Sequence, residues 1–372
     1  MRNQSGYNTT HISHIGLFNS NRVWGGGEKW HYSTAFMMKK RNLDVTVFGQ
    51  TGCELLKRTI RSGISSIGIR VYNTSFLNPF KVVKLALTFR KLNIQAIILN
   101  LPSDVKFAGI AAKLAGVKKI IYRRGSPVFV RNTLMNRFLF RHVLTDIIAN
   151  SDQIKRSILQ NNPRLTNDRK ITIIYNGVDG LLPQEKDAGR EPFARTHGVV
   201  LGTAGRLSQE KGMDWLINMA RELKTKKLDF TLLIAGEGPL MEVLRQKSHD
   251  TGLDDHLCFC GFVADMEKFY GSLDLFILTS AWEGCSNVIL EAMHSGLPVV
   301  AFNNSSIPEM VKDNISGFLV RNKDGRELAD KVELLIRDPL LRAQFGNAGK
   351  TIVREKYDQN TTFNQLITLI RR

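Results

Sequence analysis

Long apolar runs are absent from this chain, which bears on where it resides. No stretch of about 18 consecutive apolar residues occurs, the length that a membrane-spanning helix needs. The first residues, Met1 to Asn8, are polar and lack the charged-then-apolar pattern of a secretory signal. We therefore expect a soluble, cytoplasmic protein.

Cysteine is also scarce, with four residues in a chain of 372. Only Cys258 and Cys260 lie close together, and their alternate positions are typical of a strand rather than a metal-binding knuckle. No Asp-x-Asp pair lies at the end of a predicted strand. The sequence therefore predicts reduced, structural thiols and no bound metal.

Acidic residues are rare in the first half of the chain. Residues 1–180 contain 28 Lys or Arg and 8 Asp or Glu, a balance of +20, and the remaining 24 and 26 leave a balance of −2 in residues 181–372. Such asymmetry indicates that one half faces an anionic partner, which is a nucleic acid, a membrane surface or a phosphorylated substrate. A scattered, solvated surface is the alternative.

The length and the apolar pattern predict two α/β domains. A chain of 372 residues exceeds the usual domain size, and its apolar content of 43% is enough for two cores. Short apolar runs alternate with helical patterns, which favours a parallel sheet covered on both faces, with ligands at the carboxyl ends of its strands. The runs of the first half are residues 11–18, 45–48, 67–71, 96–99, 119–122, 147–149 and 171–175.

Domain boundaries follow from composition. Residues 180–197 mix proline, glycine and charges without a period and are predicted to be a linker. We predict a Rossmann-like domain over residues 1–180, a second over residues 198–354, and a C-terminal helical segment over residues 355–372.

Two segments of the first half have a pattern suited to anions. A loop ending in Gly25-Gly26-Gly27 precedes a helix that begins near Glu28, and glycines there allow close backbone approach to a phosphate. Arg123-Arg124-Gly125-Ser126 is predicted to form a loop after another strand. Tight turns need the same residue types, so ordinary turns remain an alternative for both.

In the second half, residues 205–212 form a glycine-bounded loop between a strand and a helix. Arg206 and Lys211 are five residues apart in this loop. Their side chains can converge on one anion, the guanidinium as a fork and the ammonium as a point charge. A surface turn with a charged cluster is the alternative.

A turn between Glu283 and Glu291 is the most informative stretch. It follows a predicted buried strand, residues 273–278, and opens a helix that ends at Gly296. Backbone N–H groups at 285–288 are predicted to point outward at the helix N-terminus, a site suited to a phosphate or a sugar hydroxyl. Periodicity alone also allows Glu291 to belong to a solvated helix face.

These motifs resemble those of the retaining glycosyltransferase family 4. The pattern Glu-x7-Glu, placed between Thr279-Ser280 and Ala292-Met293-x-x-Gly296-x-Pro298-Val299-Val300, is similar to the family signature. The segment Gly205-Arg206-Leu207-x-x-Glu210-Lys211-Gly212 is similar to the family's diphosphate loop. The resemblance covers nearly the whole chain and is strongest from about residue 198 to 320.

The resemblance implies a GT-B architecture, with two Rossmann-like domains, a cleft between them, and a final helix that crosses back onto the first domain. It implies that the C-terminal domain binds the sugar nucleotide and that the N-terminal domain binds the acceptor. It places Arg206 and Lys211 on the donor phosphates and Glu283 on a donor sugar hydroxyl, as the catalytic set.

The same resemblance implies further contacts. The implied donor-binding residues are Gly26, Gly27, Gly205, Gly236, Phe262, Val263, Gly284, Cys285, Ser286, Asn287 and, on the ribose, Glu291. The implied acceptor-binding residues are Glu28, Arg123 and Arg124, although many relatives carry a histidine where this chain has the arginine pair.

The expected function is transfer of a hexose or N-acetylhexosamine from a nucleotide diphosphate sugar, with UDP expected rather than GDP. The expected acceptor is a saccharide or a lipid-linked saccharide for surface polysaccharide or lipopolysaccharide synthesis, met at the inner face of the membrane, with no cofactor and no metal. A nucleotide-sugar epimerase of the same architecture is one alternative. A basic nucleic-acid-binding protein is another, but stacking aromatics are not interleaved with its basic residues, and it leaves the C-terminal loops unexplained.

Overall fold

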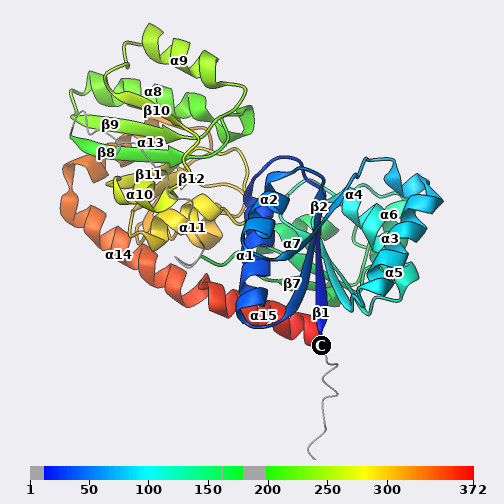
Figure 1. The fold of residues 1–372 in the computed structure, drawn as a ribbon. Helices are drawn as coiled ribbons and strands as arrows, with labels where there is room; N and C mark the ends of the chain where they lie inside the picture. The colour runs from blue at the N-terminus through cyan, green and yellow to red at the C-terminus, as the bar shows by residue number, and fades with distance from the viewer. Residues whose placement is uncertain (1–11, 161, 179–197) are drawn as a thin grey trace, which may run out of the picture. The chain divides into compact units, whose positions relative to one another are not determined.

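The chain divides into two compact units in the computed structural model, which describes residues 12–160, 162–178 and 198–372 (Figure 1). The N-terminal unit comprises the chain up to Asn176 together with Asn360–Arg372, and the C-terminal unit comprises Gly177–Gln359. The whole predicted linker, residues 180–197, lies outside the described residues.

The N-terminal unit is built on a parallel sheet in the strand order β3-β2-β1-β4-β5-β6-β7. Its strands are β1 (His14–Asn19), β2 (Asp44–Gln50), β3 (Ser65–Ile69), β4 (Ala96–Leu99), β5 (Lys119–Arg124), β6 (Asp146–Ala149) and β7 (Ile171–Ile173). Its helices are α1 (Gly26–Lys40), α2 (Glu54–Arg61), α3 (Pro79–Lys91), α4 (Pro102–Asp104), α5 (Ile110–Ala115), α6 (Leu134–Phe138), α7 (Asp152–Leu159) and α15 (Gln359–Arg371). Short 3-10 or π-helical segments are η1 (Ser75–Leu77), η2 (Val105–Gly109), η3 (Leu139–Val143) and η4 (Asp168–Lys170).

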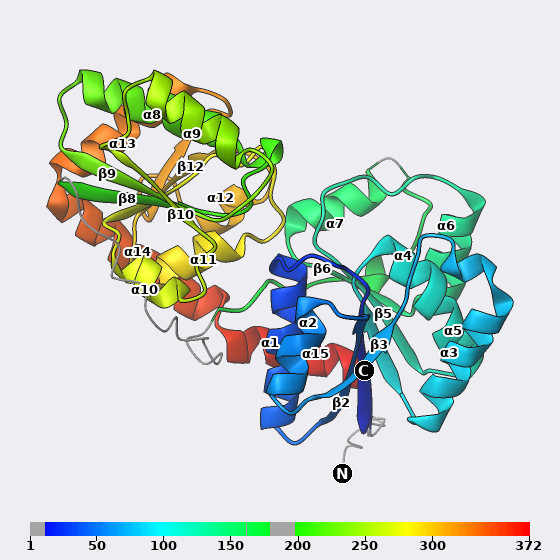
Figure 2. The same ribbon diagram turned by 45° about the horizontal axis from the view of Figure 1, so that its top comes forward.

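Helices cover both faces of this sheet, which explains the continuous apolar runs of the sequence. Helices α1 and α2 lie on one face and α3 and α5 on the other (Figures 1 and 2). The four residues of β4 are all buried as a result. Each fully buried aliphatic side chain contributes about 1.5–3 kcal/mol to folding. The predicted parallel, Rossmann-like sheet is confirmed.

Two local predictions in this unit are wrong. Gly26 and Gly27 belong to the first turn of α1 rather than to the preceding loop, and Gly25 caps the helix. Arg123 and Arg124 are the last residues of β5 rather than part of a loop, because they pair with Ile148 and Ala149 of β6. Charged residues are seldom buried, so a pair of arginines in a sequence is typical of an exposed loop.

The C-terminal unit repeats the same topology with the sheet order β10-β9-β8-β11-β12-β13. Its strands are β8 (Val199–Ala204), β9 (Phe230–Ala235), β10 (Leu257–Gly261), β11 (Leu275–Leu278), β12 (Val299–Phe302) and β13 (Gly317–Val320). Its helices are α8 (Met213–Thr225), α9 (Met241–Asp250), α10 (Met266–Gly271), α11 (Asn287–His294), α12 (Ile307–Met310), α13 (Gly325–Arg337) and α14 (Pro339–Lys356), with the 3-10 turn η5 (Gln209–Lys211). Helices α8 and α13 cover one face, and α10, α11 and α14 the other (Figure 1).

The end of the chain packs on the N-terminal unit. Arg41, just after α1, donates hydrogen bonds to the side chains of Asn360 and Asn364 in α15, at 3.0 and 2.5 Å. Its guanidinium also lies 4.8 Å from the centre of the Phe363 ring. Helix α15 is therefore part of the N-terminal unit although it follows the C-terminal unit in sequence.

The described helices are short. The longest, α14, has 18 residues. No helix in the described part of the chain combines the length and apolar composition needed to cross a bilayer.

Candidate active site

The strand order of the C-terminal sheet fixes where its functional loops meet. The chain runs outward from β8 through β9 to β10 and then returns to β11, which pairs with β8 on its other side. Ligands of such sheets bind at the carboxyl ends of the strands beside this reversal. The reversal brings together the β8 loop, residues 205–212, and the β11 loop, residues 279–286.

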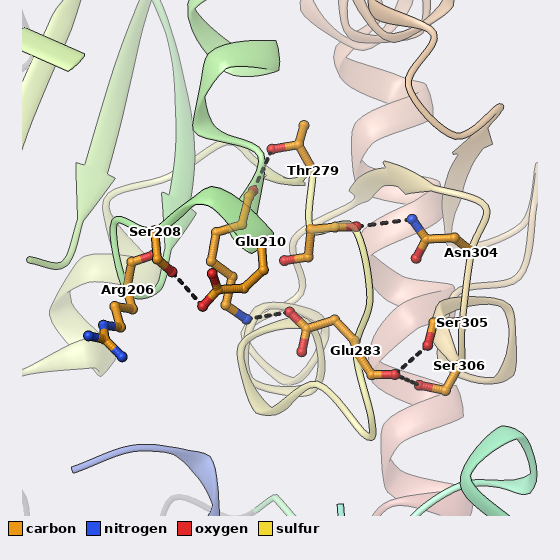
Figure 3. Close-up of polar contacts among 10 residues, drawn as sticks. Arg206, Ser208, Glu210, Thr279, Glu283, Asn304, Ser305 and Ser306 are labelled. Atoms are coloured by element: carbon orange, nitrogen blue, oxygen red, sulfur yellow. Dashed lines mark hydrogen bonds and ion pairs between the residues drawn. The ribbon is translucent and has the colours of Figure 1, made fainter. Parts of the chain in front are cut away.

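An ion pair joins these two loops. Lys211 Nζ lies 2.6 Å from Glu283 Oε1, and the two side chains are only 24% and 12% exposed. The backbones are also tied together, since Thr279 Oγ1 donates to the carbonyl oxygens of Lys211 and Gly212 at 3.1 and 3.0 Å (Figure 3). Two residues predicted to bind the same ligand therefore lie in direct contact.

A third loop, which follows β12, holds the backbone of Glu283 in place. The hydroxyls of Ser305 and Ser306, which follow β12, donate to the Glu283 backbone carbonyl at 2.6 and 3.0 Å (Figure 3). The Asn304 amide donates to the Ser280 carbonyl at 3.0 Å. The sequence alone does not identify these residues, because serine and asparagine after a strand have the composition of any turn.

Arg206 is placed differently from Lys211. Its side chain is exposed and extends away from Glu283 (Figure 3). Between them, Glu210 accepts a hydrogen bond from Ser208 Oγ at 2.7 Å, and this bond holds the pKa of Glu210 below its usual value. The predicted convergence of Arg206 and Lys211 on one anion therefore requires the Arg206 side chain to turn.

Glycines let the β8 loop lie against the loop after β9. The Leu207 N–H donates to the Glu237 carbonyl at 2.9 Å, and the Gly205 N–H donates to Ala235 at 2.9 Å. Gly236 has φ +136°, and a Cβ there would lie 1.9 Å from the Gly205 carbonyl oxygen. Only glycine fits this approach, so Gly236 shapes the site through its backbone.

The loop after β10 completes this edge of the sheet. Phe262 is half exposed and its N–H lies 3.4 Å from the Glu237 carboxylate, whereas Val263 is buried. Phe262 and Val263 lie at the same carboxyl edge as the β8 and β11 loops.

Glu291 has a buried partner that no sequence motif indicates. The hydroxyl of Tyr270, in α10, donates to Glu291 Oε2 at 3.1 Å. Burial and the neighbouring Glu291 carboxylate raise the pKa of Tyr270 well above its usual value, so this hydroxyl remains a donor. Gly284, Cys285 and Ser286 are buried before α11, and Asn287, at its first turn, is partly buried.

The other predicted site residues lie in the N-terminal unit, at the carboxyl edge of its sheet. Glu28 is buried, and its Oε1 accepts hydrogen bonds from the side-chain amides of Asn19 and Asn21 at 2.9 and 3.0 Å. A Cβ on Gly27 would lie 2.9 Å from the Asn100 amide nitrogen, so α1 approaches the loop after β4 closely.

Arg123 and Arg124 are buried cations at the end of β5. Arg123 donates to Asn176 Oδ1 at 2.7 Å, and its guanidinium lies 4.4 Å from the centre of the Trp30 ring. Arg124 donates to the Tyr122 hydroxyl at 3.3 Å. Burial and the charge of Arg123 lower the pKa of the neighbouring His31 to about 3, so this imidazole is neutral at pH 7.

Asp104 is a second buried titratable group near this edge. Its carboxylate accepts from the Ser20 hydroxyl and from the Leu101 N–H, the latter at 2.9 Å. Burial nevertheless raises its pKa from 3.8 to about 7. At a pH between these two pKa values, the Asp104 carboxyl is therefore protonated in the folded protein and ionised in the unfolded chain.

We expect this proton to make stability depend on pH. Because the unfolded state binds fewer protons in this window, the free energy of unfolding falls as pH rises from 4 to 7, by on the order of 4 kcal/mol at 1.36 kcal/mol per pH unit. Asp104→Asn keeps an acceptor for Leu101 and cannot titrate. The urea midpoint of the variant should fall less between about pH 5 and pH 8 than that of the wild type. An identical fall in both proteins would contradict the assignment.

The two units place this chain among known folds. The structure of Anabaena HepE in complex with UDP and glucose matches it with a TM-score of 0.82 at 22% identity, over 97% of this chain and 99% of that one. Two parallel-sheet α/β units of this kind define the GT-B class of glycosyltransferases, and the predicted pair of Rossmann-like domains is confirmed.

Sequence comparisons identify the family. A family profile described as Glycosyl transferases group 1 matches residues 198–338, and one described as Glycosyltransferase Family 4 matches residues 24–180. The Staphylococcus aureus capsular polysaccharide biosynthesis glycosyltransferase CapM is 25% identical over 88% of this chain and 90% of CapM. A GDP-mannose-dependent phosphatidylinositol monomannoside mannosyltransferase of Mycobacterium tuberculosis is 31% identical over 45% of this chain and 46% of its own length. The chain therefore belongs to the family 4 glycosyltransferases.

Proposed function

We propose that this glycosyltransferase moves a hexose or N-acetylhexosamine from a UDP-sugar to an acceptor hydroxyl with retention of the anomeric configuration. The observation that carries this proposal is the 2.6 Å contact between Lys211 and Glu283 at the reversal point of the C-terminal sheet. It sets a cation suited to a diphosphate beside a carboxylate suited to a sugar hydroxyl.

The proposed reaction breaks the bond between the anomeric carbon and the diphosphate oxygen and forms a bond from that carbon to the acceptor oxygen. The ammonium of Lys211 has three donors, so it can keep Glu283 and still contact the departing diphosphate. Arg206 is exposed, and in the proposed reaction its side chain turns from its observed position toward the same oxygens. These cations stabilise the negative charge that develops as the bond lengthens, without a metal ion.

The departing oxygen then takes the proton of the acceptor hydroxyl on the same face of the sugar. An inverting reaction would require a base on the opposite side of the sugar. The arginine pair at the end of β5, on the acceptor-binding unit, consists of cations that cannot act as bases at neutral pH. Attack from the same face avoids this requirement.

The proposed substrates are based on those named for the relatives and for the similar solved structure. UDP is proposed because HepE was solved with UDP and glucose, although the M. tuberculosis relative is named for GDP-mannose. A saccharide or lipid-linked acceptor for surface polysaccharide synthesis is proposed because CapM is named for capsular polysaccharide. In the N-terminal unit, Glu28, Arg123 and Arg124 are proposed to contact the acceptor. The excess of basic residues in this part of the chain suits an anionic membrane surface that presents a lipid-linked acceptor.

The experiment is a screen of nucleotide sugars for release of the nucleoside diphosphate, with and without acceptor and in the presence of a chelator. We expect acceptor-dependent release that the chelator leaves unchanged. Proton NMR of the first product, recorded before equilibration, should show an α-linkage from an α-configured donor. A β-linkage would refute the mechanism, and conversion of the donor sugar without any acceptor would favour the epimerase.

Glu291 provides a test of nucleotide recognition. We propose that its carboxylate accepts hydrogen bonds from the ribose, so Glu291→Ala should weaken binding of UDP by about 10- to 100-fold, the value of a hydrogen bond to a charged group. Calorimetry with UDP measures this loss. The matched control is Tyr270→Phe, which removes the partner hydroxyl but keeps the carboxylate and should change UDP affinity much less. Equal losses in both variants would mean that Glu291 acts only through Tyr270.

A further inference from the structure

Helix α3 carries apolar residues on two opposite faces. Val82, Leu85, Ala86 and Phe89 are buried in the core of the N-terminal unit. The opposite side, here called the α3 outer face, consists of Phe80, Val83, Lys84, Leu87 and Lys91, at helical spacing. A helix on the surface of a globular protein needs only one apolar stripe, so the second requires another explanation.

The apolar side chains of the α3 outer face are strongly exposed. Phe80 is 85% exposed, Val83 50% and Leu87 56%. Leu77, in the preceding η1 segment, is 68% exposed and extends the apolar surface beyond the helix start. These values describe protruding side chains, and such a contiguous group marks an interaction surface.

The part of the sequence that contains this surface is strongly basic. Residues 55–145 contain 17 Lys or Arg and a single acidic residue, Asp104, which is fully buried. Helix α3 itself contributes Lys81, Lys84, Arg90 and Lys91 and no acidic residue. A second copy of the chain that docked through this face would set these like charges against each other, which disfavours a homodimer.

Protruding apolar side chains interleaved with lysines suit the surface of an anionic lipid bilayer. Phenylalanine and leucine enter the boundary between headgroups and acyl chains, and lysines pair with the lipid phosphates. Long lysine stems lie along the apolar surface while their ammonium groups reach the headgroups. Helix α6 adds Leu134 and Phe138, 82% and 50% exposed, on the same side of the N-terminal sheet in both views (Figures 1 and 2).

We propose that the α3 outer face docks on an anionic bilayer surface, with Phe80, Val83 and Leu87 in the headgroup boundary and Lys84 and Lys91 on lipid phosphates. This proposal extends the membrane contact of the proposed function by naming the surface that makes it. It does not depend on the identity of the sugar or of the acceptor.

The test is flotation of the whole protein with phosphatidylglycerol vesicles and with phosphatidylcholine vesicles at low salt. We expect binding to the anionic vesicles only. The triple variant Phe80→Ser/Val83→Ser/Leu87→Ser and the double variant Lys84→Glu/Lys91→Glu should each lower the partition coefficient about tenfold or more.

Matched controls lie in the C-terminal unit. Leu340 is 81% exposed, so Leu340→Ser removes an equally exposed apolar side chain. Arg326→Glu/Arg354→Glu reverses two exposed charges, one of them in the last turn of a helix as Lys91 is. Both controls should float as the wild type does.

Several results would overturn the proposal. Wild-type binding by both α3 variants would remove this face from the contact, and absence of wild-type binding to anionic vesicles would remove the membrane. A dimer that the same variants abolish, without vesicle binding, would assign the face to a second copy instead. Release of UDP from donor with a soluble acceptor should remain unchanged in the α3 variants, which separates this proposal from the proposed function and confirms that the variants fold.

Discussion

Lys211→Ala should lower turnover about 100-fold or more, the usual effect of removing one preorganised charge contact at the developing charge. Arg206→Ala should act in the same direction, since the proposed reaction requires that side chain to turn toward the diphosphate. Steady-state kinetics with the donor identified in the screen measures both effects. The variants should fold, because both residues lie in the β8 loop rather than in the core.

Lys211 has a structural partner, so the control must separate two roles. If Lys211 acts only by neutralising Glu283, its ammonium becomes dispensable once Glu283→Gln has removed that charge, so Lys211→Ala/Glu283→Gln should be as active as Glu283→Gln alone. If the ammonium contacts the diphosphate, as we propose, the double variant should be much slower than Glu283→Gln alone. Equal activity of these two variants would therefore contradict the proposed role.

A second lysine supplies the matched control. Lys226 pairs with Asp330 and Glu333 at 2.8 and 2.6 Å, on the same unit but between helices. Lys226→Ala breaks a lysine–carboxylate contact of the same length, yet such surface pairs contribute only about 0–1 kcal/mol to stability. Its kinetics should match those of the wild type.

The sheets could be predicted from the sequence because their strands are buried on both faces. In β4 and β11 every residue is buried, so the strand is a continuous apolar run that is visible without any structure. In β5 the apolar run ends before the strand does. Its last two residues, Arg123 and Arg124, are buried cations, and no hydropathy pattern extends a strand through them.

The motifs of the sequence predict which residues belong to the candidate site, but they do not predict how those residues contact one another. Lys211 and Glu283 were each placed on the ligand by resemblance, but their contact spans 72 positions in sequence. The contact between Lys211 and Glu283 depends on the strand order, which sets β8 beside β11. This order cannot be read directly from the sequence. Ser305, Ser306 and Tyr270 belong to no motif, because each acts on a predicted site residue through one hydrogen bond.

At Gly212 a side chain is excluded by lack of space as well as by the backbone angle. Many glycines of this chain have left-handed backbone angles, so the angle alone does not distinguish this position. Gly212 caps α8 with φ +63°, and a Cβ there would lie 2.3 Å from the Thr279 carbonyl oxygen. Gly252 has nearly the same angle, φ +65°, but its nearest neighbour would be the flexible Lys224 side chain, at 3.6 Å. The two glycines therefore share the backbone strain and differ in the available space.

We expect Gly252→Ala to cost about 1 kcal/mol, because only the left-handed backbone disfavours alanine there. Gly212→Ala should cost about 2–5 kcal/mol, because a fixed backbone oxygen must also move. Lys211 adjoins this position, and displacement of a catalytic group by about 1 Å lowers rates by about 100-fold. Urea unfolding and steady-state kinetics measure both quantities. Equal stability and equal turnover in the two variants would show that the contact between the β8 and β11 loops does not position Lys211.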